Sequence, residues 1–260
     1  MAKKAGQEKY QIAHGRPIRI VPLHRPEAAR GVVAQAVPQL TYRGGPLLAV
    51  AQVFTIFWGS GWQQLPQSDF VRRINQFFDF ILTSPLLDQL AEYSVPGQQI
   101  GHGTRIGTAT LITHDPGNSV QDSAIQEMLQ QEISAGTVLP APTLNSLYFV
   151  MLPPGVQVIQ EGSASCQAFC GYHEAINSNI FYAVMPYPGC SGCTGGLAVF
   201  DALTSTTSHE LCEAITDPIP GQGWYDDING EIGDICAWRT RTLGGYTIQL
   251  EWSNKASSCV

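Results

Sequence analysis

Three apolar stretches and one threonine-rich stretch along the chain predict strands. They are residues 53–58, 104–113, 147–152 and 181–185. Short runs of this length that are rich in β-branched and aromatic residues are typical of strands covered on both faces. The sequence therefore predicts a sheet that lies inside the molecule.

Between these stretches the apolar residues return at helical spacing. Serine is a common N-cap residue, so Ser68 is expected to begin a helix with one apolar face. The pair Ser84–Pro85 predicts the start of a short second helix. Before the third helix, Ser119 and Asp122 form a capping-box pattern, and Gly136 is expected to end that helix.

Strands that alternate with helices predict an α/β fold with a mixed, mostly parallel central sheet flanked by helices. The C-terminal half is expected to be rich in loops, and it contains all seven cysteines. Residues 1–40 are basic and interrupted by prolines, with little periodicity. We therefore expect a flexible basic extension at residues 1–40 and a single domain at residues 41–260.

The overall charge excludes several classes of partner. The chain of 260 residues has 14 Lys and Arg against 21 Asp and Glu, and only 13% of its residues are charged. Nucleic acids require a basic footprint, so no nucleic-acid partner is expected. The longest apolar stretch, residues 46–58, is too short to span a bilayer, so no membrane span is expected.

The distribution of charge is more informative than its total. Seven of the 14 basic residues lie in the first 30 positions, and none lies between Arg105 and Arg239. That interval holds 14 carboxylates, eight of them from Asp201 to Asp234. Clustered carboxylates repel one another, so this segment is either a solvated acidic face or a cation site. The basic extension could shield such a site electrostatically.

Residues 205–216 predict a helix that carries metal ligands and ends before Asp217–Pro218. His209 and Glu213 are four residues apart, so both side chains can reach one ion. Glu210 lies beside them and can take a proton from a bound water. This pattern resembles the His-Glu-x-x-His helix of zinc hydrolases, with a carboxylate as the second ligand. The alternative is a surface helix with a solvated histidine and two solvated glutamates.

The next segment offers a third ligand and further catalytic groups. Asp234 is the first choice as a ligand, Glu231 the second and His173 the third. Three protein ligands would leave one position of the ion open for water. His173 or Tyr225 could stabilise the oxyanion that forms during hydrolysis.

A calcium loop is an intermediate alternative, because hard cations prefer ligands that are all oxygen. Its ligands would be Asp226, Asp227, Asn229, Glu231 and Asp234. The spacing of these residues does not match an EF-hand.

The cysteines raise a separate question. Local disulfides within the two close pairs are favoured, together with a Cys236–Cys259 bond that holds the C-terminus in an oxidising compartment. The close pairs are Cys166 with Cys170 and Cys190 with Cys193. A structural four-cysteine zinc site is the alternative, because the pairs are 19 residues apart. Cys212 remains as the odd cysteine and is expected to be buried beside the helix.

Several motifs in a fixed order resemble the exordium (phosphate-induced) protein family. They lie at residues 42–48, 53–59, 169–173 and 214–218, and the resemblance covers residues 41–260. The sequences at 209–218 and 230–234 are similar to those of bacterial relatives. Because plant members of the family are secreted, the resemblance implies a secreted or extracytoplasmic location.

Taken together, these patterns predict a secreted zinc-dependent peptidase that acts on a peptide or protein substrate. A zinc-activated water would attack, with Glu210 as general base and His209, Glu213 and Asp234 as ligands. The alternative is a non-enzymatic, exordium-like extracellular binding protein whose acidic segment is structural or holds calcium.

Overall fold

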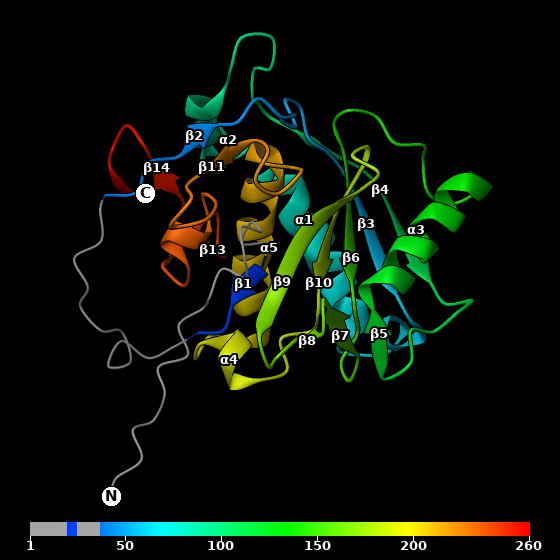
Figure 1. Cartoon of the computed structure of the whole chain (residues 1–260). Helices are drawn as coiled ribbons and strands as arrows, with labels where there is room; N and C mark the ends of the chain where they lie inside the picture. Colours follow the sequence, from blue (N-terminus) through cyan, green and yellow to red (C-terminus); the bar gives the residue numbers. More distant parts are fainter. Residues whose placement is uncertain (1–19, 25–36) are drawn as a thin grey trace, which may run out of the picture.

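A six-stranded sheet forms the centre of the molecule (Figure 1). The computed structural model describes residues 20–24 and 37–260, and residues 1–19 and 25–36 lie outside the described part. In spatial order the strands are β1 (Ile20–Pro22), β9 (Phe169–Ile176), β10 (Ile180–Met185), β6 (Ser146–Met151), β3 (Gln52–Trp58) and β4 (Thr104–Leu111).

The predicted mixed, mostly parallel sheet is confirmed. Strands β10, β6, β3 and β4 are parallel to one another, with Phe54 opposite Tyr148 and Tyr148 opposite Tyr182. Strand β9 is antiparallel to β10, and β1 is antiparallel to β9. The antiparallel end of the sheet is therefore made of β9 and the short strand β1.

Helices cover both faces of this sheet (Figure 1). Side chains alternate along β3, so that Phe57 faces α1, α2 and α5 whereas Ile56 faces α3. The five α-helices of the described residues are α1 (Gln67–Ile81), α2 (Pro85–Leu90), α3 (Asp122–Ala135), α4 (Ser191–Thr194) and α5 (Val199–Thr216). Two apolar clusters, one on each face, make up the core.

The helix ends test the predicted caps. Ser84 caps α2, because its hydroxyl accepts a hydrogen bond from the backbone of Leu86, and Gly136 ends α3 in the left-handed conformation, as predicted. The other two caps are wrong. Helix α1 begins at Gln67 with Ser68 already inside it, and Ser119 lies in a strand that pairs with residues 157–159. Pairing with a distant strand overrides the local capping pattern.

Short strands and 3-10 turns complete the fold. The remaining strands are β2 (Thr41–Tyr42), β5 (Ser119–Gln121), β7 (Gln157–Gln160), β8 (Ser163–Ala164), β11 (Trp224–Tyr225), β12 (Thr240–Leu243), β13 (Tyr246–Gln249), β14 (Trp252–Ser253) and β15 (Ser258–Cys259). The 3-10 turns are η2 (Ser60–Gln63), η3 (Ala91–Tyr93) and η4 (Asp234–Cys236). Most of these pieces lie after β6, which agrees with the expected loop-rich C-terminal half.

Three disulfides hold this half together. They are Cys166–Cys190, Cys170–Cys193 and Cys236–Cys259, and each joins residues 23 or 24 positions apart. The predicted Cys236–Cys259 bond is confirmed, whereas local bonds within the two close pairs are wrong. The structure links the start of β9 to α4, because these segments lie side by side. Both pairs are consumed in S–S bonds, which leaves no thiolates for a four-cysteine zinc site.

Part of the expected extension belongs to the body of the protein. Residues 20–22 form β1, and Leu40 is buried in the core. Most of the other residues of the expected extension, 1–19 and 25–36, lie outside the described residues. Within the described part of the chain, no helix combines the length and the apolar character needed to cross a membrane.

Candidate metal centre

Helix α5 is buried in the interior, and so are most of its polar residues. Every residue from 202 to 216 is buried, because the helix lies between strands β9 and β10 on one side and the β12–β13 hairpin on the other. Small residues at 204–208 allow the hairpin to approach closely. Thr204 Oγ1 donates to the carbonyl of Thr247 at 2.7 Å, and the backbone of Gln249 donates to Ser208 Oγ at 2.9 Å.

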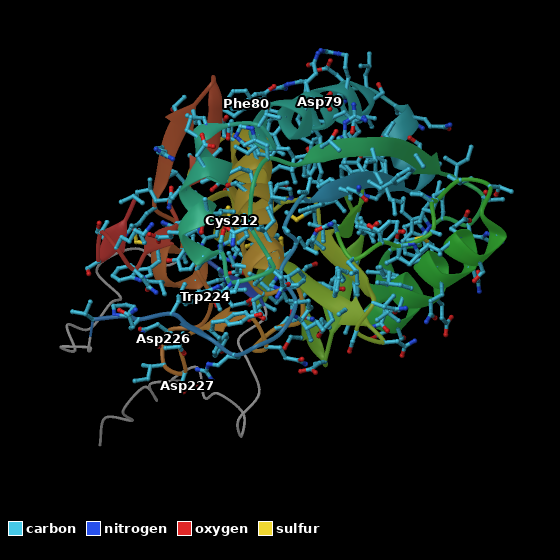
Figure 2. The ribbon with its side chains drawn as sticks, turned by 90° about the horizontal axis from the view of Figure 1, so that it is seen from above. Asp79, Phe80, Cys212, Trp224, Asp226 and Asp227 are labelled. Carbon is cyan, nitrogen blue, oxygen red and sulfur yellow. A yellow bond between two sulfur atoms is a disulfide. The ribbon has the colours of Figure 1, made fainter. Side chains whose placement is uncertain are left out.

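As a result, His209, Glu210 and Glu213 are all fully buried. The alternative of a surface helix with solvated side chains is therefore wrong. Burying ionisable groups is unfavourable unless they are paired or bind an ion. Cys212, on the same helix, is buried and unpaired as expected, and Figure 2 shows it at the centre of the molecule.

The first group of candidate ligands consists of His209, Glu213 and Asp234, the three ligands preferred from the sequence. One ligand atom from each lies within 4.8 Å of the others. His209 Nε2 lies 2.9 Å from Glu213 Oε1, and the backbone of Asp234 donates to the same oxygen at 3.0 Å. The 3-10 turn η4 therefore brings Asp234 to the helix.

A second group shares Glu213 with the first and adds His173 and Glu210. His173 lies on β9, on the face of the sheet that is covered by α5. Its Nδ1 atom is 3.1 Å from Glu210 Oε2 and 3.7 Å from Glu213 Oε2. Its Nε2 atom is 3.4 Å from Glu231 Oε1 and 3.1 Å from the carbonyl of Asp217. His173 thus lies in the middle of three carboxylates.

We call these six residues the acid–histidine cluster: His173, His209, Glu210, Glu213, Glu231 and Asp234. These contacts bring together every ligand of the predicted zinc site, including the substitute Glu231.

Electrostatics within the cluster favour positive charge. Burial alone would lower the pKa of His173 and His209, but neighbouring glutamates raise both pKa values well above the usual range. Burial also raises the pKa of three carboxyl groups, and repulsion from Glu213 adds to the effect. These three are Glu210, Glu231 and Asp234. In the absence of another cation, the cluster therefore holds extra protons.

Several buried oxygens of the cluster have no hydrogen-bond partner. They are Glu210 Oε1, Glu213 Oε2 and both carboxylate oxygens of Glu231. Each unsatisfied group of this kind costs about 1–3 kcal/mol, and a charged group costs more. His209 Nε2 is also unsatisfied, even though Glu213 Oε1 is only 2.9 Å away. One cation placed between this nitrogen and the unpartnered oxygens would satisfy them together, so these residues fit a zinc ion.

Gln249 controls which nitrogen of His209 can bind a metal. Its Nε2 atom lies 2.8 Å from His209 Nδ1 and donates to the carbonyl of Gly233, while its Oε1 accepts from the backbone of Trp238. In this orientation Nδ1 is the acceptor, and the proton of the neutral imidazole is on Nε2. Metal binding through Nε2 therefore requires the Gln249 amide to turn, so that its oxygen accepts from Nδ1.

Gly233 is needed for the close approach of η4 to the helix. A Cβ atom at this position would lie 2.8 Å from His209 Nδ1 and 2.9 Å from Glu213 Oε1. We expect Gly233→Ala to lower the free energy of unfolding by about 1–3 kcal/mol, measured by urea denaturation. The control is Gly101→Ala, because a Cβ there meets no atom within 4 Å. Equal stability of the two variants would contradict this account of Gly233.

Tyr225 lies on β11 and is buried. Its backbone carbonyl accepts hydrogen bonds from Thr41 Oγ1 at 3.2 Å and from Arg43 at 3.5 Å. The Arg43 guanidinium also lies 5.9 Å from the centre of the Tyr225 ring. These contacts place Tyr225 next to residues 41–43, and its role as an oxyanion donor stays a prediction.

The structure divides the residues of the calcium alternative. Asp226 Oδ1 accepts from the backbones of Ile228 and Asn229, so it stabilises a turn. Asp227 is exposed and pairs with Arg43 at 2.9 Å. Figure 2 shows both aspartates at the rim of the molecule, whereas Glu231 and Asp234 belong to the acid–histidine cluster. Among the described residues, the groups with metal-ligand spacing include neither Asp226 nor Asp227.

Three polar residues near the cluster were missed in the sequence. Glu251 is fully buried with both carboxylate oxygens unpartnered, and burial raises its pKa well above the usual value. Gln249 holds His209. Asp217 accepts backbone hydrogen bonds from residues 221–223 and closes the loop after α5, and burial raises its pKa to about 6. Only Asp217 had a sequence signal, the proline that follows it.

No protein-family model, curated protein or solved structure matches the chain. The resemblance of residues 41–260 to the exordium proteins therefore stays a prediction. What the protein does is inferred below from the chemistry of the acid–histidine cluster.

Proposed function

We propose that this protein is a zinc-dependent peptidase. One observation carries the proposal: three ligand atoms of suitable chemistry, from His209, Glu213 and Asp234, lie within 4.8 Å of one another. Directly beside them, Glu210 keeps one carboxylate oxygen free of hydrogen bonds. Nitrogen and carboxylate ligands with a neighbouring glutamate are the parts that a metal-dependent hydrolase needs.

Each residue has a distinct task. His209, Glu213 and Asp234 would hold the zinc, with Glu231 as a substitute ligand. A zinc ion bound there acts as a Lewis acid and lowers the pKa of water toward neutrality. Glu210 accepts the proton of the attacking water on its free Oε1 and passes it to the leaving amine.

His173 is placed to assist Glu210. Its imidazole is 3.1 Å from Glu210 Oε2, so it orients the carboxylate and leaves the opposite oxygen available. His173 or Tyr225 also supplies the hydrogen bond to the developing oxyanion. Such a donor is typically worth about 3 kcal/mol in the transition state.

Three disulfides support a location outside the reducing cytosol. An exported peptidase from a bacterial branch of the exordium-like proteins accounts for both the cysteine bonds and the helix motif.

One observation favours a second candidate function. His173, His209, Glu210, Glu213 and Glu231 are all fully buried. A buried centre suits a structural ion in a non-enzymatic, exordium-like binding protein, because such an ion needs no access for substrate.

Metal analysis separates the two functions. We expect protein purified without chelator or metal-affinity resin to contain about one zinc per chain, because the two groups of candidate ligands around α5 share Glu213. A zinc chelator should abolish hydrolysis of a peptide library, and added zinc should restore it. Zinc without any turnover would favour the binding protein. If no transition metal is bound and none is taken up, the peptidase proposal fails.

A further inference from the structure

Strand β1 occupies an edge of the sheet that would otherwise be open. It pairs with β9 through Ile20 opposite Tyr172 and Val21 opposite Gly171. β1 also lies next to α5. A three-residue strand contributes little stability by itself, so it can be exchanged for another extended segment.

Residues of β9, α4 and the segment around Trp238 contact both the side chains and the backbone of β1 and the residues after it. Val21 is buried against the Cys170–Cys193 disulfide. Leu23, two residues on, packs against Gly192 of α4, where a Cβ atom would lie 3.1 Å from Leu23 Cδ2. Apolar side chains at alternate positions therefore have places to bind, as in strand addition to a sheet edge.

Two backbone hydrogen bonds hold the segment that follows Val21. The indole of Trp238 donates to the carbonyl of Pro22 at 2.8 Å, and the backbone of His24 donates to the carbonyl of Gly192 at 2.7 Å. Contacts with backbone atoms do not depend on the identity of the side chains. A different extended peptide could make the same two hydrogen bonds.

This edge is next to the acid–histidine cluster. A Cβ atom at Gly171 would lie 3.2 Å from Glu210 Oε1, the unpartnered oxygen of the proposed general base. Val21 lies directly opposite Gly171. Neighbouring strands are about 4.8 Å apart, so a peptide on this edge runs one strand away from the backbone that contacts Glu210.

We propose that the edge of β9, with walls formed by α4 and Trp238, is the binding site for an extended peptide substrate, and that residues 20–24 occupy it in this chain. The site selects apolar side chains at the positions of Val21 and Leu23. This inference rests on the proposed function for the identity of the peptide as a substrate, but the binding step is independent of metal.

The test uses full-length protein and a fluorescent peptide of residues 15–25, GRPIRIVPLHR. Val21→Asp places a charge in the apolar site and should release β1. We expect the variant to bind the peptide at least about tenfold more tightly than the wild type, because tethered β1 competes at an effective concentration in the millimolar range. The matched control is Val138→Asp, at an exposed position, which should bind like the wild type.

Two further measurements keep the test decisive. Circular dichroism must show that the variant is folded, and Leu23→Asp, at a half-buried position, replaces it if it is not. A peptide that itself carries Val21→Asp should not bind. Equal binding by wild type and folded variant, or binding by neither, would overturn the inference.

Failure of this inference can be distinguished from failure of the proposed function. Zinc content should be the same in Val21→Asp and in the wild type, because Val21 is not a member of the cluster. Peptide binding without hydrolysis would retain the binding site and remove the peptidase. Zinc-dependent hydrolysis by a protein whose β9 edge binds no peptide would retain the peptidase and remove the binding site.

Discussion

Replacing Glu210 with glutamine is expected to lower the rate of peptide hydrolysis by about 10²–10⁴-fold while zinc remains bound. Glutamine has nearly the same shape as glutamate but cannot accept the proton of the attacking water. Its side chain can still form a hydrogen bond with His173, which lies 3.1 Å from Glu210 Oε2 in the native protein. Rates would be measured with a peptide library, and zinc by elemental analysis of the same samples.

The matched control for this experiment is Glu127→Gln, which makes the same chemical change at an exposed position on α3. It should retain the activity of the wild type. Unchanged hydrolysis in Glu210→Gln would remove Glu210 from the mechanism. A loss of zinc together with activity would show that Glu210 is a ligand, as its grouping with His173 and Glu213 allows.

The second large effect is expected for His209→Ala, which should remove the bound zinc. Only carboxylates of the first group would remain, and zinc favours a nitrogen ligand in such sites. An ion at about 1,000 times its Kd stabilises a folded protein by about 4 kcal/mol, and this contribution should disappear. Thermal unfolding with and without added zinc measures the difference.

In that experiment the control is His114→Ala, because His114 is exposed and lies outside the cluster. It should keep both the zinc and the dependence of unfolding on zinc. His209→Ala should show no response of its unfolding temperature to zinc. If it binds and responds to zinc like the wild type, His209 is not a ligand.

Local signals in the sequence predicted the end of the helix and the positions of its candidate ligands, whereas α5 begins six residues before the predicted start at 205. His209 and Glu213 follow from helical spacing alone, and the end of α5 follows from Pro218. The strands β3, β6 and β10 were also predictable, because each is a short apolar run. These features depend on neighbouring residues, so the sequence contains them directly.

Features that depend on distant pairing were not predictable. Ser119 pairs across to residue 157 rather than capping α3, and Cys166 bonds to Cys190 because β9 and α4 lie side by side. Glu251 reaches the region of the cluster through the C-terminal strands. No spacing rule links it to His209, which is 42 positions earlier in the chain.

The unpaired Cys212 provides a chemical probe in the interior of this protein. Six of the seven cysteines form disulfides, so a thiol reagent has a single target in the oxidised chain. Burial raises the pKa of this thiol well above its usual value, and Figure 2 shows it at the centre of the molecule. Alkylation therefore requires the layers around α5 to separate. The rate of alkylation therefore reports how often the native protein opens around the helix that carries His209 and Glu210.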